Sequence, residues 1–123
     1  MIGKISEKDK FTTLVVDDEQ DLADIAAELL ALHGMETVVA YSAQQALEIM
    51  ELRNDIDAIF SDVMMPNMTG FEFAGIAAKN YPMIKIVLTS GFVALDRWNQ
   101  TAHHYEFVNK PYFIDAVIEK LRR

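Results

Sequence analysis

The sequence contains no cysteine, so it forms no disulfide and offers no thiolate ligand to a metal. It also lacks an uninterrupted apolar run near the roughly 18 residues that a membrane-spanning helix requires. Residues 1–10 are mostly polar and contain no apolar segment typical of a signal peptide. We therefore expect a cytoplasmic chain that does not contact a membrane, with residues 1–10 as a mobile N-terminal tail.

Basic side chains are also scarce. The chain carries 11 Lys and Arg against 19 Asp and Glu, which gives a formal net charge of −8. Such a surface repels the phosphate backbone of DNA and RNA, so direct nucleic acid binding is not expected. A basic cluster at the C-terminus, Lys120, Arg122 and Arg123, falls where cations offset the dipole of a last helix.

No repeat, low-complexity tract or linker interrupts the 123 residues, so we expect one domain over residues 11–123. Segments rich in β-branched residues alternate with segments of helical periodicity. The predicted strands are 11–16, 37–40, 57–61, 84–88 and 106–108. The predicted helices are 22–32, 42–50, 71–79 and 112–121, with a further one near Leu95, Trp98, Ala102 and Tyr105. This order is typical of an α/β domain with a parallel sheet and helices on both faces.

Apolar residues show helical periodicity in two of the predicted helices. In the first helix they recur at helical spacing, as Leu22, Ile25, Ala26, Leu29, Leu30 and Leu32. In the last helix we expect one face to carry Phe113, Val117, Ile118 and Leu121.

Polar residues close four of the predicted strands. Asp17 and Asp18 follow the first strand, Asp62 the third, Thr89 the fourth and Lys110 the fifth. The carboxyl ends of parallel strands share one edge of a sheet, and ligands of such sheets bind there. Three carboxylates, a hydroxyl and an ammonium would meet at this edge. That set suits a divalent cation and a phosphoryl group.

The chemistry of these residue types supports this interpretation. A carboxylate can attack phosphorus and form an acyl phosphate, but crowded carboxylates raise one another's pKa values. Mg²⁺ prefers oxygen ligands and would cancel this repulsion, and Mn²⁺ is an alternative. Lys110 would provide a fixed positive charge for the phosphoryl oxygens.

In this pattern the chain resembles the receiver domain of bacterial two-component response regulators, from Phe11 to Leu121. The family has an acidic pair after its first strand, an aspartate after the third, Thr or Ser after the fourth and Lys-Pro after the fifth. The segment 62–70, Asp-Val-Met-Met-Pro-Asn-Met-Thr-Gly, closely resembles the family signature Asp-x-x-Met-Pro-x-Met-x-Gly.

The resemblance implies a flavodoxin-like fold with strand order 2-1-3-4-5 and a role for each matching residue. Asp62 would be the phosphoacceptor. Asp18, Asp62 and the backbone carbonyl of Met64 would bind the metal directly, and Asp17 through water. Thr89 and Lys110 would contact phosphoryl oxygens. Thr89 and Phe107 would form the switch that changes the surface of the fourth helix, fifth strand and fifth helix.

The implied partners are a histidine kinase or a histidine phosphotransfer protein as donor, and a downstream protein or an output domain absent from this chain as target. The domain would not be an enzyme beyond promoting its own phosphorylation and dephosphorylation. Met64, two residues after Asp62, and Gly91, two after Thr89, offer no group to orient an attacking water, so slow self-dephosphorylation is expected.

Other functions remain open at this point. The fold could serve as a scaffold for protein interaction without phosphorylation, although the site residues are all present. A metal-dependent phosphohydrolase with an aspartate nucleophile would need a second acid two residues later, where Met64 stands. A nucleotide-binding domain is disfavoured because no glycine-rich phosphate loop is present. His103 and His104 are adjacent and would make poor joint metal ligands.

Overall fold

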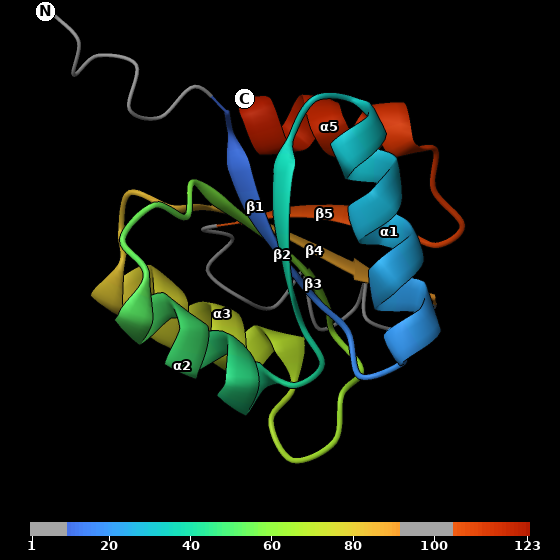
Figure 1. Cartoon of the computed structure of the whole chain (residues 1–123). Coiled ribbons are helices and arrows are strands. Elements are labelled where there is room, and N and C mark those ends of the chain that lie inside the picture. Colours follow the sequence, from blue (N-terminus) through green and yellow to red (C-terminus); the bar gives the residue numbers. More distant parts are fainter. Residues whose placement is uncertain (1–9, 92–104) are drawn as a thin grey trace, which may run out of the picture.

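The computed structural model describes residues 10–91 and 105–123 (Figure 1). Residues 1–9 of the expected tail and the helix expected around Leu95, Trp98 and Ala102 lie outside these ranges, as do His103 and His104. The strands are β1 (Thr12–Val16), β2 (Glu36–Ala40), β3 (Ala58–Asp62), β4 (Lys85–Ser90) and β5 (Glu106–Asn109). The helices are α1 (Gln20–Leu32), α2 (Ala43–Leu52), α3 (Gly70–Asn80) and α5 (Ile114–Arg122).

The five strands form one parallel sheet in the order β2-β1-β3-β4-β5, which confirms the predicted fold class and strand order. Helices α1 and α5 cover one face of the sheet, and α2 and α3 cover the other (Figure 1). In the described residues, no helix is both long and apolar enough to cross a membrane.

The central strands are apolar on both sides because each face of the sheet is covered. Leu14 and Val16 of β1 enter the core beneath α2 and α3, whereas Val15 between them enters the core beneath α1 and α5. Ile59 and Phe60 of β3 divide in the same way. This alternation fixes which side chains can project from the sheet edge.

Side-chain caps start two of the helices. Ser42 Oγ accepts a hydrogen bond from the Gln45 N–H at the start of α2 (3.0 Å). Thr69 and Glu72 form a reciprocal capping box at the start of α3, with bonds of 3.2 and 2.9 Å. Each cap satisfies backbone N–H groups that a helix start leaves open.

The prediction that four apolar residues share one face of α5 was wrong at one residue. Phe113 is 85% exposed, whereas Val117 and Leu121 are buried. The helix begins only at Ile114, and Phe113 is its N-cap with extended backbone angles. Its side chain therefore does not follow the angular spacing of the helix, and it points away from the core.

The apolar residues of α1 lie on two sides of the helix. Ala26 and Leu30 are buried with Ala23 and Ala27, but Leu22, Ile25, Leu29 and Leu32 are exposed. The helical periodicity was right, yet the sequence carries two apolar stripes and only one faces the sheet. The second stripe lies on the outer surface of the domain.

Candidate functional site

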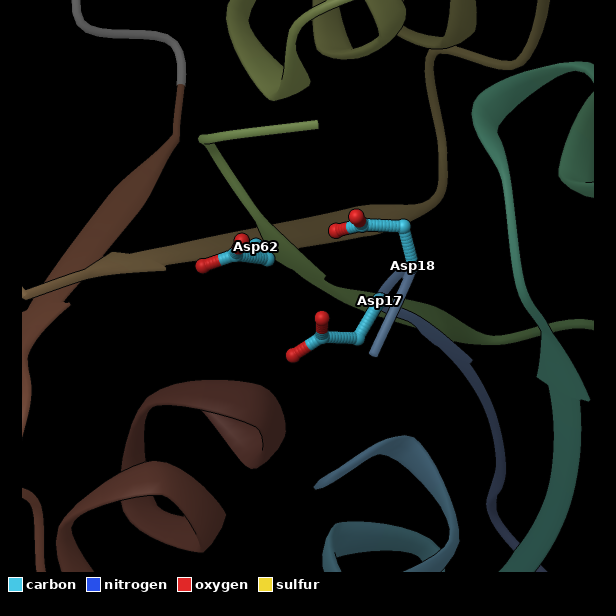
Figure 2. A group of neighbouring side chains, drawn as sticks. All are labelled: Asp17, Asp18 and Asp62. Carbon is cyan, nitrogen blue, oxygen red and sulfur yellow. The ribbon is translucent and has the colours of Figure 1, made fainter. Parts of the chain in front are cut away.

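Three aspartates meet at the carboxyl edge of the sheet. Asp17 and Asp18 directly follow β1, and Asp62 is the last residue of β3 (Figure 2). One carboxylate oxygen from each lies within 4.8 Å of the others. Asp17 and Asp62 are each only 7% exposed, and Asp18 is the most exposed of the three. The structure thus brings together the three acids that strand-end positions had predicted.

Lys110 reaches this group from the loop after β5. Its Nζ lies 3.1 Å from Asp62 Oδ1 and 3.8 Å from Asp17 Oδ2. The peptide bond from Lys110 to Pro111 is cis. The Lys110 backbone N–H donates to the Ser90 carbonyl (2.9 Å), and this hydrogen bond restrains the residue whose ammonium group lies near the two most buried carboxylates.

Burial raises the pKa of Asp62 to about 6, and Asp17 adds to this effect while Lys110 opposes it. Burial likewise raises the pKa of Asp17, against the hydrogen bond from the Glu19 N–H (3.0 Å). Burial acting alone would lower the pKa of Lys110, but the charges of Asp62 and Asp17 leave it raised. One cation thus stands among three acids, and the site has the charge and oxygen ligands to hold a divalent cation.

Thr89 provides a hydroxyl beside the phosphoacceptor candidate. Its Cα is the register partner of Asp62 in the β3–β4 pair. The side chain is 2% exposed, and its Oγ1 has no hydrogen-bond partner within the part of the chain that the structure describes. A buried hydroxyl without a partner costs free energy, so an incoming acceptor oxygen would gain a hydrogen bond here.

The loop after β3 is held tightly against the strand. The Val63 N–H donates to the Thr89 carbonyl (2.9 Å), and the Gly70 N–H donates to the Val63 carbonyl (2.8 Å). A Cβ atom at position 70 would lie 2.3 Å from the Asp62 carbonyl oxygen. Only glycine fits so close to the backbone. The sequence signature contained this glycine, but its physical reason was not predicted.

A cavity of about 430 Å³ extends from the acids toward α1. Asp17, Asp62, Thr89 and Lys110 line its polar end, and apolar residues that include Leu22, Ile25 and Tyr112 line the remainder. Sequence reasoning missed this apolar end because helical spacing alone does not tell which apolar residues of α1 face outward. The site therefore combines an anionic pocket with an apolar wall.

Two further predicted residues lie near this edge. Phe107 of β5 is partly buried against the core beneath α2 and α3, and it is the register partner of Leu88, next to Thr89. Met64 lies two residues after Asp62 with an exposed side chain. The switching role of Phe107 and the metal-binding role of the Met64 carbonyl stay predictions.

The chain matches known proteins in sequence. Residues 13–122 match the family described as response regulator receiver domain. The response regulator FleR of Pseudomonas aeruginosa is 29% identical over 112 residues, which cover 89% of this chain and 24% of FleR. The sensor kinase CckA of Brucella abortus is 34% identical over 104 residues, which cover 82% of this chain and 11% of CckA. The chain thus spans a quarter or less of these two curated relatives.

Solved structures show the same fold. The response regulator TrrA of Thermotoga maritima, solved in complex with Mg²⁺ and BeF, superimposes with a TM-score of 0.78 at 29% identity. The match covers 91% of this chain and 96% of TrrA.

Proposed function

This chain belongs to the response regulator receiver domain family, and we propose that it is a phosphorylation-controlled signalling module in which Asp62 accepts the phosphoryl group. The observation that carries the proposal is the setting of Asp62. Its carboxylate is buried at the strand end, 3.1 Å from the Lys110 ammonium and beside the Thr89 hydroxyl, which has no hydrogen-bond partner among the described residues. These groups would bind a phosphoryl group on Asp62 from two sides.

We propose that the site holds Mg²⁺, or Mn²⁺ in its place, through Asp18, Asp62 and the backbone carbonyl of Met64, with Asp17 acting through water. The donor set consists of hard oxygens, which suits these cations. When bound, the cation supplies positive charge that offsets the repulsion between the carboxylates and an incoming phosphoryl group. The relative TrrA was solved with Mg²⁺ and BeF, which supports the assignment.

The reaction that these residues support is a phosphoryl transfer. An Asp62 carboxylate oxygen attacks phosphorus, the bond from phosphorus to the donor imidazole nitrogen breaks, and the imidazole leaves with that electron pair. Lys110 pairs with one phosphoryl oxygen as charge shifts during transfer, and Thr89 Oγ1 donates a hydrogen bond to another. Asp62 reacts as the carboxylate, which predominates above its pKa of about 6.

The same contacts provide a switch. The phosphoryl group would draw Thr89 toward the site. Phe107 of β5, the register partner of Leu88 directly before Thr89, would turn toward the space that Thr89 leaves. The surface of β5 and α5 would then change shape, and the fourth helix expected beside them lies outside the described residues. We propose that a downstream protein or an output domain outside this chain reads that surface, and that the exchange takes place in the cytoplasm.

The outer stripe of α1 suggests how the donor docks. Leu22, Ile25 and Leu29 are exposed beside the cavity, at the helical spacing that packs against another helix. Asp21, Asp24 and Glu28 flank this stripe and are exposed. We propose that the stripe binds a helix of the histidine kinase or histidine phosphotransfer protein, with an apolar ridge and basic flanks that complement these acids.

Intact mass after incubation with acetyl phosphate tests the acceptor role. We expect one phosphoryl addition that requires Mg²⁺ and is absent from Asp62→Asn. An unchanged mass with acetyl phosphate and also with phosphorylated histidine donors would contradict the proposal and favour a scaffold without phosphorylation. Turnover of a phosphate ester added as substrate would instead indicate a phosphohydrolase.

Docking is tested separately, with a panel of autophosphorylated histidine kinases and histidine phosphotransfer proteins from the same genome. We expect Leu29→Gln to slow transfer from the cognate donor by about tenfold, because an apolar contact at an interface is lost. Leu52→Gln changes an exposed leucine at the end of α2 and serves as the matched control. Equal transfer rates for the two variants would contradict docking on α1.

A further inference from the structure

Met64 is held in an exposed position beside the phosphoacceptor candidate. Its neighbours Val63 and Met65 are buried, at 2% and 7% exposure, whereas Met64 is 57% exposed. The Val63 N–H donates to the Thr89 carbonyl (2.9 Å), and the Met65 N–H donates to the Val63 carbonyl (3.1 Å). Because the backbone is restrained on both sides, the thioether of Met64 is presented to solvent two residues after Asp62.

Most of the other described methionines are less exposed. Met35, Met50 and Met65 are buried in the two cores, and Met68 is partly buried against one of them. Met83 is also exposed, at 92%, but it lies between α3 and β4, at the opposite edge of the sheet. Oxidation of a thioether by peroxide requires access. Within the described ranges, then, two exposed methionines are open to oxidant, and Met64 is the one near Asp62.

We propose that Met64 is an oxidation site that sets the lifetime of the phosphoryl group on Asp62. The inference rests on the proposed function. In the reaction with hydrogen peroxide, the O–O bond breaks and one oxygen atom is transferred to the thioether sulfur. The other oxygen takes up the proton of the transferred oxygen and leaves as water. The sulfur is oxidised by two electrons and the peroxide is reduced. Methionine sulfoxide reductases reverse the modification, so it would act as a switch.

The expected effect follows from the change in hydrogen bonding. A thioether is a weak acceptor and does not orient water, whereas a sulfoxide oxygen is a polar acceptor. Because Met64 lies two residues after Asp62, its sulfoxide oxygen would hold a water near the acyl phosphate. Gaining one net hydrogen bond to that water corresponds to hydrolysis roughly threefold to tenfold faster. Oxidation would thus shorten the signal.

The test is the half-life of the phosphorylated protein before and after mild hydrogen peroxide, with peptide mapping to locate each added oxygen. We expect Met64 and Met83 to be oxidised before the buried methionines, and the half-life to fall severalfold. Met83→Leu should show the same fall as the unmodified sequence. In Met64→Leu, peroxide should leave the half-life of that variant unchanged.

Three results would overturn the proposal. Met64 could resist peroxide while buried methionines react, the half-life could stay constant although Met64 is oxidised, or Met64→Leu could respond as strongly as Met83→Leu. Met64→Gln, whose amide oxygen is a polar acceptor, gives a second measure and should shorten the half-life without peroxide. If the untreated protein never acquires a phosphoryl group, the proposed function itself fails, which is a distinct result.

Discussion

The two ends of β3 carry aspartates in opposite circumstances. Asp57, just before the strand, accepts a hydrogen bond from the Thr12 N–H (2.8 Å) and ties β1 to β3. Asp62, at the other end of the strand, lies with Asp17 and Asp18 and has one nearby cation, Lys110. Asp57 at the amino edge stabilises the fold, whereas the three acids at the carboxyl edge lower its stability.

Charges elsewhere at the amino edge are also matched. Arg53 forms a two-bond pair with Asp55 (2.9 and 2.6 Å), and Glu106 at the start of β5 pairs with Lys120 and Arg123 at the end of α5. The comparison teaches that an excess of like charge, rather than the presence of charge, distinguishes the site from a structural surface.

The largest effect on stability is expected at Gly70. Gly70→Ala would place a Cβ atom 2.3 Å from the Asp62 carbonyl oxygen. The strand backbone cannot move away to relieve this clash without distorting the site. We expect a loss of about 3 kcal/mol in the free energy of unfolding, the upper range for overpacking, together with a loss of phosphorylation. Urea denaturation and intact mass measure the two effects.

Gly75→Ala provides the matched control for this substitution. Nothing lies within 4 Å of a Cβ at position 75, inside α3. We expect a gain of about 0.5–1 kcal/mol, because alanine favours the helix. Equal effects of the two substitutions would show that the approach of Gly70 to Asp62 is not required by the fold.

Charge removal should affect the two ends of β3 in opposite directions. Without metal at pH 7, Asp62→Asn should raise the free energy of unfolding by about 2 kcal/mol, because the folded protein no longer pays for a buried carboxylate. Asp57→Ala should lower it by about 1–2 kcal/mol, because the Thr12 N–H loses its acceptor.

The pH dependence of stability tests independently whether the Asp62 carboxylate destabilises the fold. Asp62 has a pKa of about 6 in the folded protein against 3.8 as its ordinary value. Between these values the folded state binds more protons than the unfolded state, so this acid lowers stability as pH rises from about 4 to 6. Relative to the unmodified sequence, Asp62→Asn should gain stability over this range. A constant difference from pH 4 to pH 7 would contradict the raised pKa.

The smallest effect is expected at the amino edge. Glu106→Gln removes the carboxylate that pairs with Lys120 (3.7 Å) and Arg123 (3.1 Å). These partly exposed pairs should contribute less than about 1 kcal/mol, and less still at high salt. Thermal unfolding at low and high ionic strength measures this. A loss as large as that of Asp57→Ala would mean that the Glu106 pairs hold α5 in place.

Much of the site could be predicted because strand ends can be located from the sequence alone. A polar residue that closes an apolar run lies at a sheet edge whatever the order of the strands, so Asp17, Asp62, Thr89 and Lys110 could be placed together. Strand order is a three-dimensional property, and only the family resemblance predicted it.

Other features could not be obtained in this way. Periodicity identified α1 but could not distinguish its buried stripe from its exposed one, because both are apolar. Phe113 was placed on the apolar face of the last helix because the start of α5 was placed two residues too early. The close approach of Gly70 to Asp62 depends on how the loop folds back, which no local pattern specifies.

The most direct test of the account is to locate the phosphoryl group on the chain. Borohydride reduces an acyl phosphate to an alcohol, so treating the phosphorylated protein converts the acceptor aspartate to homoserine, which peptide mapping identifies. We predict conversion at Asp62 and none at Asp17, Asp18 or Asp57. Conversion at another aspartate, with Asp62 intact, would contradict the claim that the crowded carboxyl edge of the sheet serves to phosphorylate Asp62.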